Sequence, residues 1–383
     1  MKAWPIIPLR SVLYSHIDAV VSAQLNTVNL AGVYGFGRGL FKRGPIMPLD
    51  TTYKSFHRLN AGDFVISSPK AWEGAVARIS EEFDGWFLSP VFPTFRADAE
   101  KLDTRFLDWY CKRDAVWRQL QGKAKGMGAR RESVSPDQFL SIEVPLPPLA
   151  EQQAIVARLD ALAEKTRQVE AHQDAVEHDA EHLLALRFRD AIANAATRTM
   201  AEVAPLVRRE PSIDLNGSYP ELGIRSFGKG TFHKPPLSGS EVGTKRLYCI
   251  EPGDLLFSNV FAWEGAIAIA QPEDAGRFGS HRFITCQVHP DLTTVAFLRY
   301  YFLTDEGMLK IGEASPGGAG RNRTLGLEKL MAIEVPLPTL TTQQAFDRLQ
   351  AEVAGLKAKH AAIRRASTAL LPATLERVFA GGD

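Results

Sequence analysis

Cysteine is scarce in this sequence, and the few cysteines do not form a pattern. Cys111, Cys249 and Cys286 are the three cysteines of a 383-residue chain, and they lie far apart. Disulfide frameworks and zinc sites need cysteines at short, repeated spacings. We therefore expect plain buried thiols, as in proteins of a reducing compartment.

Long hydrophobic runs and a charge imbalance are missing as well. No run approaches the roughly 18 apolar residues of a membrane-spanning helix. Pro5, Pro8 and Arg10 interrupt the N-terminal region where a signal peptide needs an unbroken apolar stretch. These absences predict a cytoplasmic protein without a membrane partner. The net charge of +1 excludes no partner class, because nucleic-acid binding needs a local basic face rather than a basic average.

Motifs for catalysis are also absent. The sequence has no Gly-x-x-x-x-Gly-Lys-Ser/Thr phosphate loop and no Asn/Asp-Pro-Pro-aromatic run for adenine methylation. Residues 36–39 (Phe-Gly-Arg-Gly) lack the preceding strand and following helix of a cofactor-binding loop. His178 and His182 share a charged helix face, which is more typical of a solvated surface than of a metal site. We expect a chain that is not an enzyme and binds no cofactor itself.

The dominant positive feature is an internal duplication. Residues 142–153 (Ile-Glu-Val-Pro-Leu-Pro-Pro-Leu-Ala-Glu-Gln-Gln) return 191 residues later at 333–344 as Ile-Glu-Val-Pro-Leu-Pro-Thr-Leu-Thr-Thr-Gln-Gln. The same offset relates Ala-Trp-Glu-Gly-Ala at 71–75 and 262–266. It also relates the Gly-Asp pairs at 62–63 and 253–254. An ungapped register of this length indicates a tandem of two equivalent units.

The repeat predicts an α+β protein of two domains and two long helices. Short apolar runs at 63–67, 75–79 and 91–92 are typical of a small irregular sheet. Residues 104–120 then show one helical face, with Thr104 as the expected N-cap and Thr294 as its counterpart. The predicted boundaries are a first domain at 1–148, a first helix at 149–195, a second domain at 196–339 and a second helix at 340–383.

The two long helices carry heptad-like apolar positions. In the first helix the predicted seam is Ile155, Leu159, Leu162, Thr166, Val169, Gln173, Val176, Ala180 and Leu183. In the second helix it is Phe346, Leu349, Val353, Leu356, Ile363 and Leu370, and we expect Pro372 to disturb the helix beyond that point. Alternating spacings of three and four predict that the helices pair as a coiled coil.

This order of domain, proline string, Gln-Gln and helix, occurring twice, resembles the specificity subunit of type I restriction-modification systems. The resemblance covers essentially the whole chain. It lies mainly in residues 145–159 and their echo at 336–349, and in Gly-Asp-Phe-Val-Ile-Ser at 62–67 and Gly-Asp-Leu-Leu-Phe-Ser at 253–258. The chain departs from the pattern at Thr341-Thr342, which replace Ala150-Glu151.

The resemblance implies a DNA-recognition subunit. Two α/β target-recognition domains would each read half of a bipartite target in double-stranded DNA, and an antiparallel coiled coil would set the spacer between the halves. Two methyltransferase subunits would dock on the chain, and restriction (motor-nuclease) subunits would complete the complex. S-adenosylmethionine, ATP and magnesium would belong to those partners. The alternative is a DNA-binding or adaptor subunit of another methyltransferase-linked anti-phage defence complex.

Candidate DNA-contacting residues are basic side chains on glycine-rich segments, together with one asparagine. Arginines there suit phosphate oxygens, because half or more of protein–DNA hydrogen bonds go to the DNA backbone. They also suit the edge of guanine. Residues 67–70 and 258–261 differ between the units, so Lys70 could contact guanine and Asn259 adenine, unless both are merely exposed loop residues. The candidates are Arg38, Lys42, Arg43, Lys70, Lys123, Lys125, Arg130, Arg131, Arg225, Lys229, Lys234, Asn259, Arg321 and Arg323.

The repeated Trp-Glu-Gly at 72–74 and 263–265 has two interpretations. Its glutamate could accept a hydrogen bond from cytosine, or its tryptophan could anchor a turn at the glycine. Domains that read different half-sites should differ where they touch bases and agree where they hold shape. The repeat therefore favours the structural interpretation.

Overall fold

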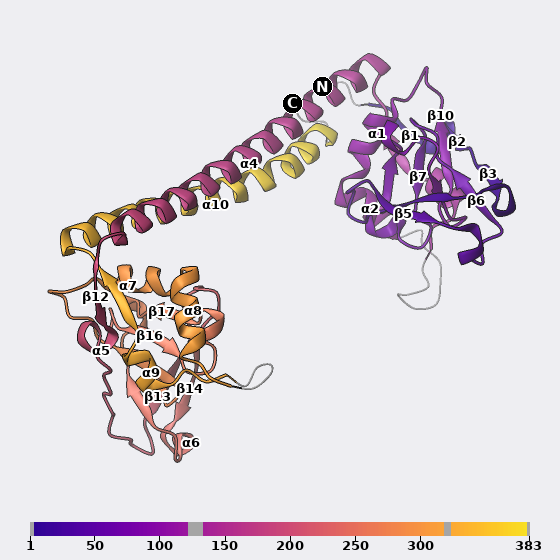
Figure 1. Ribbon diagram of the computed structural model, residues 1–383. Helices are drawn as coiled ribbons and strands as arrows, with labels where there is room; N and C mark the ends of the chain where they lie inside the picture. Colours follow the sequence, from indigo (N-terminus) through magenta and orange to yellow (C-terminus); the bar gives the residue numbers. More distant parts are fainter. Residues whose placement is uncertain (1–3, 122–132, 318–322, 381–383) are drawn as a thin grey trace. The chain divides into compact units, whose positions relative to one another are not determined.

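The computed structural model describes residues 4–121, 133–317 and 323–380 (Figure 1). It divides into two compact units, of which unit 1 comprises residues 1–173 and 360–383 and unit 2 comprises residues 174–359. Unit 1 thus contains both ends of the chain, and each long helix contributes one end to each unit. In the described residues, no helix is long and apolar enough to cross a membrane.

Unit 1 is an α+β domain built from short strands. Its four-stranded sheet has the order β2-β10-β7-β8 and its five-stranded sheet has the order β3-β6-β9-β4-β5. Only the β4–β9 pair among these described strands is parallel. The elements are β1 (Ile6–Pro8), β2 (Leu13–Ser15), β3 (Asp18–Val21), β4 (Val28–Val33), β5 (Leu40–Ile46), β6 (Ser55–Arg58), β7 (Phe64–Ile66), β8 (Val76–Arg78), β9 (Phe87–Leu88), β10 (Thr94–Ala97), α1 (Thr104–Cys111), α2 (Asp114–Gln121), α3 (Pro136–Leu140) and β11 (Glu143–Pro145).

Unit 2 repeats this plan. Its three-stranded sheet β17-β16-β19 corresponds to β8-β7-β10 of unit 1, and its second sheet has the order β14-β13-β18-β15. The elements are β12 (Ala196–Thr199), α5 (Met200–Val203), β13 (Ser218–Ile224), β14 (Thr231–Ser238), α6 (Gly239–Val242), β15 (Leu247–Cys249), β16 (Leu255–Ser258), β17 (Ile267–Ile269), β18 (Phe278–Ser280), β19 (Phe283–Cys286), α7 (Val295–Phe302), α8 (Asp305–Glu313), α9 (Leu327–Met331) and β20 (Glu334–Leu337). The α+β fold class and the tandem arrangement are confirmed.

The strand that enters each domain pairs with the strand that leaves it. In unit 1, β1 and β11 are antiparallel, with Ile6 opposite Pro145. In unit 2, β12 and β20 are antiparallel, with Thr197 opposite Pro336. These two pairs are related by the same 191-residue offset as the sequence repeat. The proline strings therefore form one edge of a β-pair in each unit.

The segment 104–120 differs from the prediction of a single capped helix. It forms two helices, because the chain leaves helical geometry after Cys111 and α2 begins at Asp114. Asp103, not Thr104, caps α1, and its side chain accepts a hydrogen bond from the amide of Arg105. Its counterpart Thr294 caps α7 as predicted. The predicted run at 91–92 is a turn, and the strand there is β10.

The core of each domain lies between the central sheet and the α1–α2 or α7–α8 pair. In unit 1 it includes Phe64, Phe95 and Phe106, all at most 1% exposed. Cys111 and Cys286 are buried thiols, and Cys249 is half-buried and also free. Burial raises the pKa of Cys286 to about 12, so this thiol stays protonated and unreactive.

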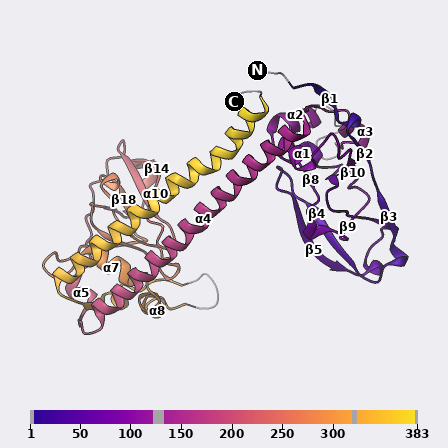
Figure 2. The same ribbon diagram turned by 90° about the horizontal axis from the view of Figure 1, so that it is seen from above.

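Two long helices, α4 (Leu149–Ile192) and α10 (Leu340–Phe379), pair antiparallel within each unit (Figures 1 and 2). In unit 1, Ile155 and Leu159 near the start of α4 share a core with Leu375 and Phe379 at the end of α10. In unit 2, Leu184 and Phe188 near the end of α4 share a core with Phe346 and Val353 at the start of α10. The predicted antiparallel coiled coil is confirmed.

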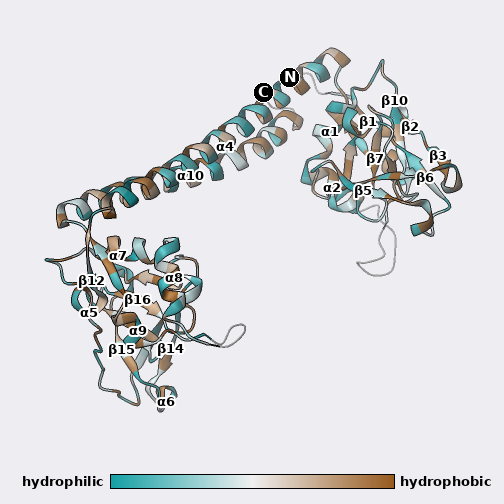
Figure 3. Ribbon diagram, in the orientation of Figure 1, coloured by the Kyte–Doolittle hydropathy of each residue, from teal (hydrophilic) through white to brown (hydrophobic). Residues whose placement is uncertain are grey.

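The seam of this helix pair departs from the predicted heptad at its outer positions. Val169, Leu183, Ile363 and Leu370 are 42–48% exposed, whereas Gln173 is buried as predicted. Leu184 and Phe188 fill the seam instead, because their side chains meet the domain core as well as the other helix. Figure 3 shows hydrophilic residues along much of both helices, with hydrophobic residues interspersed. The 3.6-residue period therefore drifts away from a strict heptad.

Pro372, which we expected to disturb the second helix, lies within it. α10 continues without interruption to Phe379. Pro372 removes one backbone hydrogen bond, but the turn that follows is fixed by packing. Phe379 lies against the rings of Phe106 and Tyr110 at centroid distances of 5.3 and 5.2 Å. Arg113 forms an ion pair of 2.6 Å with Glu376.

The first glutamine of each Gln-Gln pair ties a long helix to its domain. The fully buried Gln152 accepts a hydrogen bond from the Asp103 amide (2.9 Å) and donates to the carbonyls of Lys101 (2.8 Å) and Pro147 (2.9 Å). Gln343 repeats this at the Thr294 amide (3.0 Å) and at the carbonyls of Leu292 (3.0 Å) and Pro338 (2.9 Å). Each amide thus bridges the helix start, the proline string and the loop that caps α1 or α7.

We expect Gln152→Ala to destabilise unit 1 by about 3 kcal/mol, because it leaves a buried carbonyl, a part-buried carbonyl and a part-buried amide without their partner. The neighbouring Gln153 is exposed, so Gln153→Ala is the matched control and should change little. Native-state hydrogen exchange should show lost protection in the 102–111 segment of the first variant only. Equal protection in the two variants would contradict this role of Gln152.

Candidate nucleic-acid interface

The repeated Trp-Glu-Gly motif forms an identical turn in both units. Residues Ala71–Glu73 and Ala262–Glu264 are single 3-10 turns that end at glycines with φ of 75° and 76°. Each tryptophan donates from Nε1 to the carbonyl three residues earlier, at 3.1 Å for Trp72 and 2.9 Å for Trp263. The structural interpretation of the motif, a tryptophan that anchors a turn, is confirmed.

The glutamates of these turns are engaged within the protein. Glu73 accepts two hydrogen bonds from Lys70, of 3.0 and 2.9 Å. Glu264 accepts one from the hydroxyl of Ser226, of 3.1 Å. Glu264 therefore ties its turn to the hairpin loop, whereas Glu73 is bonded within its own turn segment.

Each turn holds the tip of a glycine-rich hairpin loop through the backbone. In unit 1 the amides of Phe36 and Gly37 donate to the carbonyls of Glu73 (2.7 Å) and Gly74 (2.9 Å). In unit 2 the amides of Phe227 and Gly228 donate to the carbonyls of Glu264 and Gly265, both at 2.8 Å. The loops of residues 34–39 and 225–230 are thus fixed by equivalent bonds in the two units.

A third segment meets the turn in each unit. In unit 1, α2 ends at Gln121, whose side chain donates to the Trp72 carbonyl (3.4 Å). The chain returns at Val134, whose amide donates to the Ser68 carbonyl (2.8 Å). In unit 2 it returns at Leu325, whose amide donates to the Asn259 carbonyl (2.8 Å). We call the hairpin loop, the Trp-Glu-Gly turn with the four residues before it, and the ends of this third segment the loop cluster of each unit.

Two of the predicted basic residues of unit 1 lie in the loop cluster, whereas Lys123, Lys125, Arg130 and Arg131, like Arg321 of unit 2, lie outside the residues that the structure describes. Arg38 is exposed, donates from Nε to the Gly35 carbonyl (3.1 Å) and lies over the Tyr34 ring at 4.8 Å. Lys70 is exposed, lies over the Trp72 ring at 5.5 Å and pairs with Glu73. These aromatic and acidic neighbours orient the cations without burying them.

Lys42 and Arg43 do not lie on the loop, contrary to the prediction, because the loop is shorter and both residues belong to strand β5. Lys42 pairs with Glu82 at 3.4 Å and lies over the Trp86 ring at 5.4 Å. Arg43 is exposed on the same strand. Lys234 is likewise on strand β14 and is half-buried. These three side chains are therefore not brought into the loop clusters.

In unit 2 four candidates share the loop cluster. Arg225 donates to the Thr231 carbonyl and lies over the Phe232 ring at 5.0 Å. Lys229 lies over the Phe227 ring at 5.7 Å, and Arg323 over the Trp263 ring at 5.4 Å. Asn259 is half-buried, and its Oδ1 atom is buried without a hydrogen-bond partner. In this conformation Asn259 does not present both amide atoms to a base edge.

The two loop clusters differ at positions that the repeat register makes equivalent. Tyr34, which stacks on Phe41 at 4.2 Å, occupies the place of Arg225. Lys70 occupies the place of Phe261. Sequence reasoning missed Tyr34, although the 191-residue offset pairs it with Arg225. Equivalent backbones thus present different side chains in the two units.

Arg299 supports the loop cluster of unit 2 and was not predicted. It extends from α7 and donates from a terminal guanidinium nitrogen to the Gly228 carbonyl (2.6 Å). Burial lowers the pKa of Arg299 from its ordinary value. Its register equivalent, Asp108, pairs with Lys112 (2.8 Å). The position that braces the hairpin loop in unit 2 is thus filled in unit 1 by a carboxylate that bonds Lys112 and the Arg78 amide.

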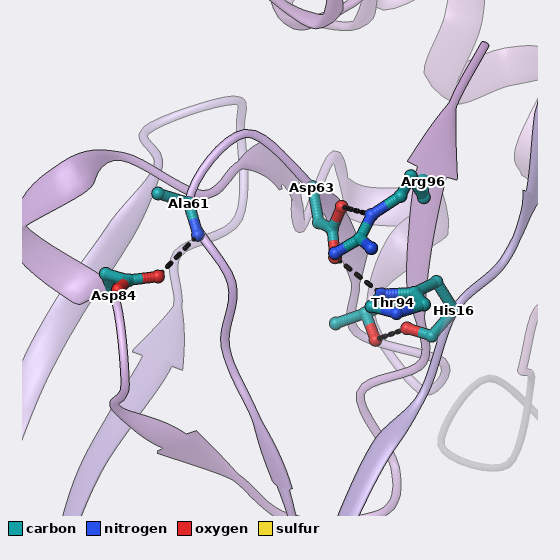
Figure 4. A network of polar contacts seen from close by, with 6 residues as sticks. All are labelled: His16, Ala61, Asp63, Asp84, Thr94 and Arg96. Carbon is teal, nitrogen blue, oxygen red and sulfur yellow. Dashed lines mark hydrogen bonds and ion pairs between the residues drawn. The ribbon is translucent and has the colours of Figure 1, made fainter.

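The repeated Gly-Asp pairs are structural as well. Asp63 is buried and accepts from Arg96 at 2.8 and 3.1 Å and contacts His16 Nδ1 at 2.8 Å (Figure 4). In unit 2 the buried Asp254 takes its arginine from another segment, Arg209, at 2.7 and 3.1 Å. These bonded carboxylates hold the start of β7 and β16, and no cluster of metal-binding side chains occurs among the described residues.

We expect Gly74→Ala to disrupt the loop cluster of unit 1 and Gly85→Ala to serve as its control. Both glycines have positive φ, of 75° and 73°, but only at Gly74 would a Cβ meet another side chain, Trp117 at 2.5 Å. The control should lose about 1 kcal/mol from backbone strain alone. Gly74→Ala should lose about 3 kcal/mol because Trp117 must also move. Thermal denaturation measures both, and equal losses would contradict this packing.

Comparison with known proteins gives this architecture a context. Over its length the chain is similar to the HsdS subunit from Thermoanaerobacter tengcongensis, with a TM-score of 0.64, 20% identity, and coverage of 100% of this chain and 97% of that chain. It is also similar to a chain in a structure described as "Structural basis underlying complex assembly and conformational transition of the type I R-M system", with a TM-score of 0.68, 19% identity, and coverage of 99% and 98%. These likenesses show the fold.

Sequence comparison finds a family model that matches part of the chain. A comparison with curated proteins finds no match. Residues 29–178, which include the first loop cluster and about two thirds of α4, match the family model described as "Type I restriction modification DNA specificity domain". The resemblance to type I restriction-modification specificity subunits is thus confirmed by a family match over residues 29–178, and the same loop cluster is built a second time in unit 2.

Proposed function

We propose that this chain is the DNA sequence-recognition subunit of a type I restriction-modification complex. The observation that carries the proposal is the specificity-domain match over residues 29–178. It is supported by the loop clusters, which have the same backbone in both units but different side chains. Each domain reads one half of a bipartite target. The paired helices set the spacer between the halves and dock methyltransferase subunits.

The proposed division of the chain follows the elements. The first target-recognition domain covers residues 1–148 and the second covers 196–339, with spacer helices at 149–195 and 340–383. The chain is non-catalytic and acts in the cytoplasm, and methyl transfer and cleavage belong to partner subunits. Support for the partners comes from the similar chain in the type I complex-assembly structure and from the exposed apolar residues Leu183 and Leu370 on the helices.

The loop clusters are the proposed DNA-contacting surface. Exposed cations that are oriented but not neutralised by burial, such as Arg38 and Arg323, suit phosphate oxygens. Base reading falls to positions that differ between the units, of which Tyr34 and Arg225 form the best-defined pair. An arginine at such a position reads guanine through a bidentate contact, which a tyrosine cannot make.

The test of this function is the methylation pattern of the host genome. Deletion of the gene should abolish methylation at one bipartite motif, and a plasmid copy should restore it. A copy with Gly74→Ala, which disrupts one loop cluster, should restore it poorly, whereas Gly85→Ala should restore it well. An unchanged methylome on deletion would refute the role in modification.

The spacer function has a separate test at the helices. Inserting four residues after Gln173 in α4 and after Lys359 in α10 adds about 6 Å to each helix while nearly keeping the helical phase. At about 3.4 Å per base pair, the methylated motif should gain one or two spacer base pairs. The control replaces four exposed helix residues with alanine at constant length. An unaltered spacer in the insertion variant would exclude the helices as the ruler.

A further inference from the structure

Phe36 and Phe227 adopt a backbone conformation that side chains normally avoid. They are the non-glycine residues with positive φ in the described part of the chain, at 62° and 60°. The left-handed region is disfavoured for residues with a Cβ, and glycine occupies it freely. Both units nevertheless place a phenylalanine there, at equivalent positions at the tips of the hairpin loops.

The two rings contribute little to the folding of their units. The side chain of Phe36 is 61% exposed and that of Phe227 is 75% exposed. Phe36 contacts the edge of Trp117 at a centroid distance of 5.9 Å, but Met308 stands at the Trp117 position in unit 2. The loops are held through backbone amides, which any residue supplies. An exposed ring on a disfavoured backbone thus calls for a role outside the domain fold.

The role must be the same in both units although their targets differ. Around each ring the side chains change, with Tyr34 against Arg225 and Lys70 against Phe261, while the Phe-Gly pair is kept. Side chains that read different bases should differ between the units. A retained ring therefore fits a contact that does not depend on base identity, such as stacking on a base face.

We propose that Phe36 and Phe227 are apolar wedges, each of which inserts against a base-pair step of duplex DNA and seats its domain on the duplex. This inference rests on the proposed function and deepens it. Phenylalanine wedges of this kind partly unstack a step and bend the duplex. The exposed neighbours of each ring include two cations, Arg38 and Lys70 in unit 1 and Arg225 and Lys229 in unit 2, beside the exposed rings of Tyr34 and Phe261. That charge suits flanking phosphates rather than an apolar protein surface.

The glycine substitutions Phe36→Gly and Phe227→Gly separate folding from DNA contact. Glycine suits the left-handed backbone, so each variant should keep or raise its melting temperature. Loss of a stacking ring should raise the Kd for the target duplex roughly tenfold for each ring. The salt dependence of binding should stay the same, because no phosphate contact is removed. Phe36→Trp, which keeps a flat ring, should bind as the wild type does.

The experiment uses the full chain with its methyltransferase partner and the bipartite duplex that the methylome defines. 2-Aminopurine is placed in turn at the adenines of each half-site and its flanks, where its fluorescence rises on unstacking. The wild-type complex should show a rise at one step in each half. Phe36→Gly should abolish the rise in one half and Phe227→Gly in the other. Leu49→Ala, which removes a 94% exposed side chain outside the loop cluster, is the control and should change neither signal nor Kd.

Other outcomes overturn the proposal in distinguishable ways. Specific binding by the wild type without any fluorescence rise, or wild-type Kd values for both glycine variants, would refute the wedges and leave the proposed function standing. A lower melting temperature in the glycine variants would show that the rings serve the fold. Loss of methyltransferase copurification with unchanged DNA affinity would assign the rings to a protein contact. Failure of the wild-type complex to bind any specific duplex would overturn the proposed function itself.

Discussion

The buried amide of one glutamine in each unit is the constraint on which the rest of the structure depends. Gln152 and Gln343 each bond one backbone amide and two carbonyls, and so join the start of a long helix to the proline string and to the loop before α1 or α7. Because a buried polar group left unpaired is costly, the direction in which each long helix leaves its domain is fixed by hydrogen bonds rather than by apolar contact alone. A helix that is to act as a spacer needs a rigid attachment of this kind.

The second attachment comes from the opposite end of the other helix, so each unit is completed by residues distant in sequence. Phe379 packs on Phe106 and Tyr110 in unit 1. Phe188, 191 residues earlier, packs on Phe297 and Tyr301 in unit 2 at centroid distances of 5.1 and 6.5 Å. The last turn of α10 therefore makes in unit 1 the aromatic contact that a turn of α4 makes in unit 2. This equivalence explains why α10 remains helical through Pro372.

Much of this architecture was predictable from the sequence, because the duplication fixes the number of domains and the ungapped register supplies a second copy of most elements, although β2 and β3 have no equivalent strand in unit 2. The same register would have corrected one error, since Thr294 aligns with Asp103 and not with Thr104. Other features depend on tertiary contacts that periodicity does not report. Val169 and Leu183 keep heptad spacing yet stay exposed, because the domain cores draw Leu184 and Phe188 into the seam. At the candidate interface, composition indicated Arg38 and Arg225, but Lys42 and Lys234 belong to strands. The residue type of Phe36 and Phe227 does not predict that they are exposed.

The pairing of β1 with β11 and of β12 with β20 has an evolutionary consequence. Since the chain enters and leaves each domain through neighbouring antiparallel strands, both junctions of a domain lie at one place on its surface. Recombination within the proline segment 142–148, which ends just before α4 begins at Leu149, would exchange the whole first domain and leave both long helices unchanged. New specificities can then arise by the exchange of whole domains, without the stepwise accumulation of loop mutations.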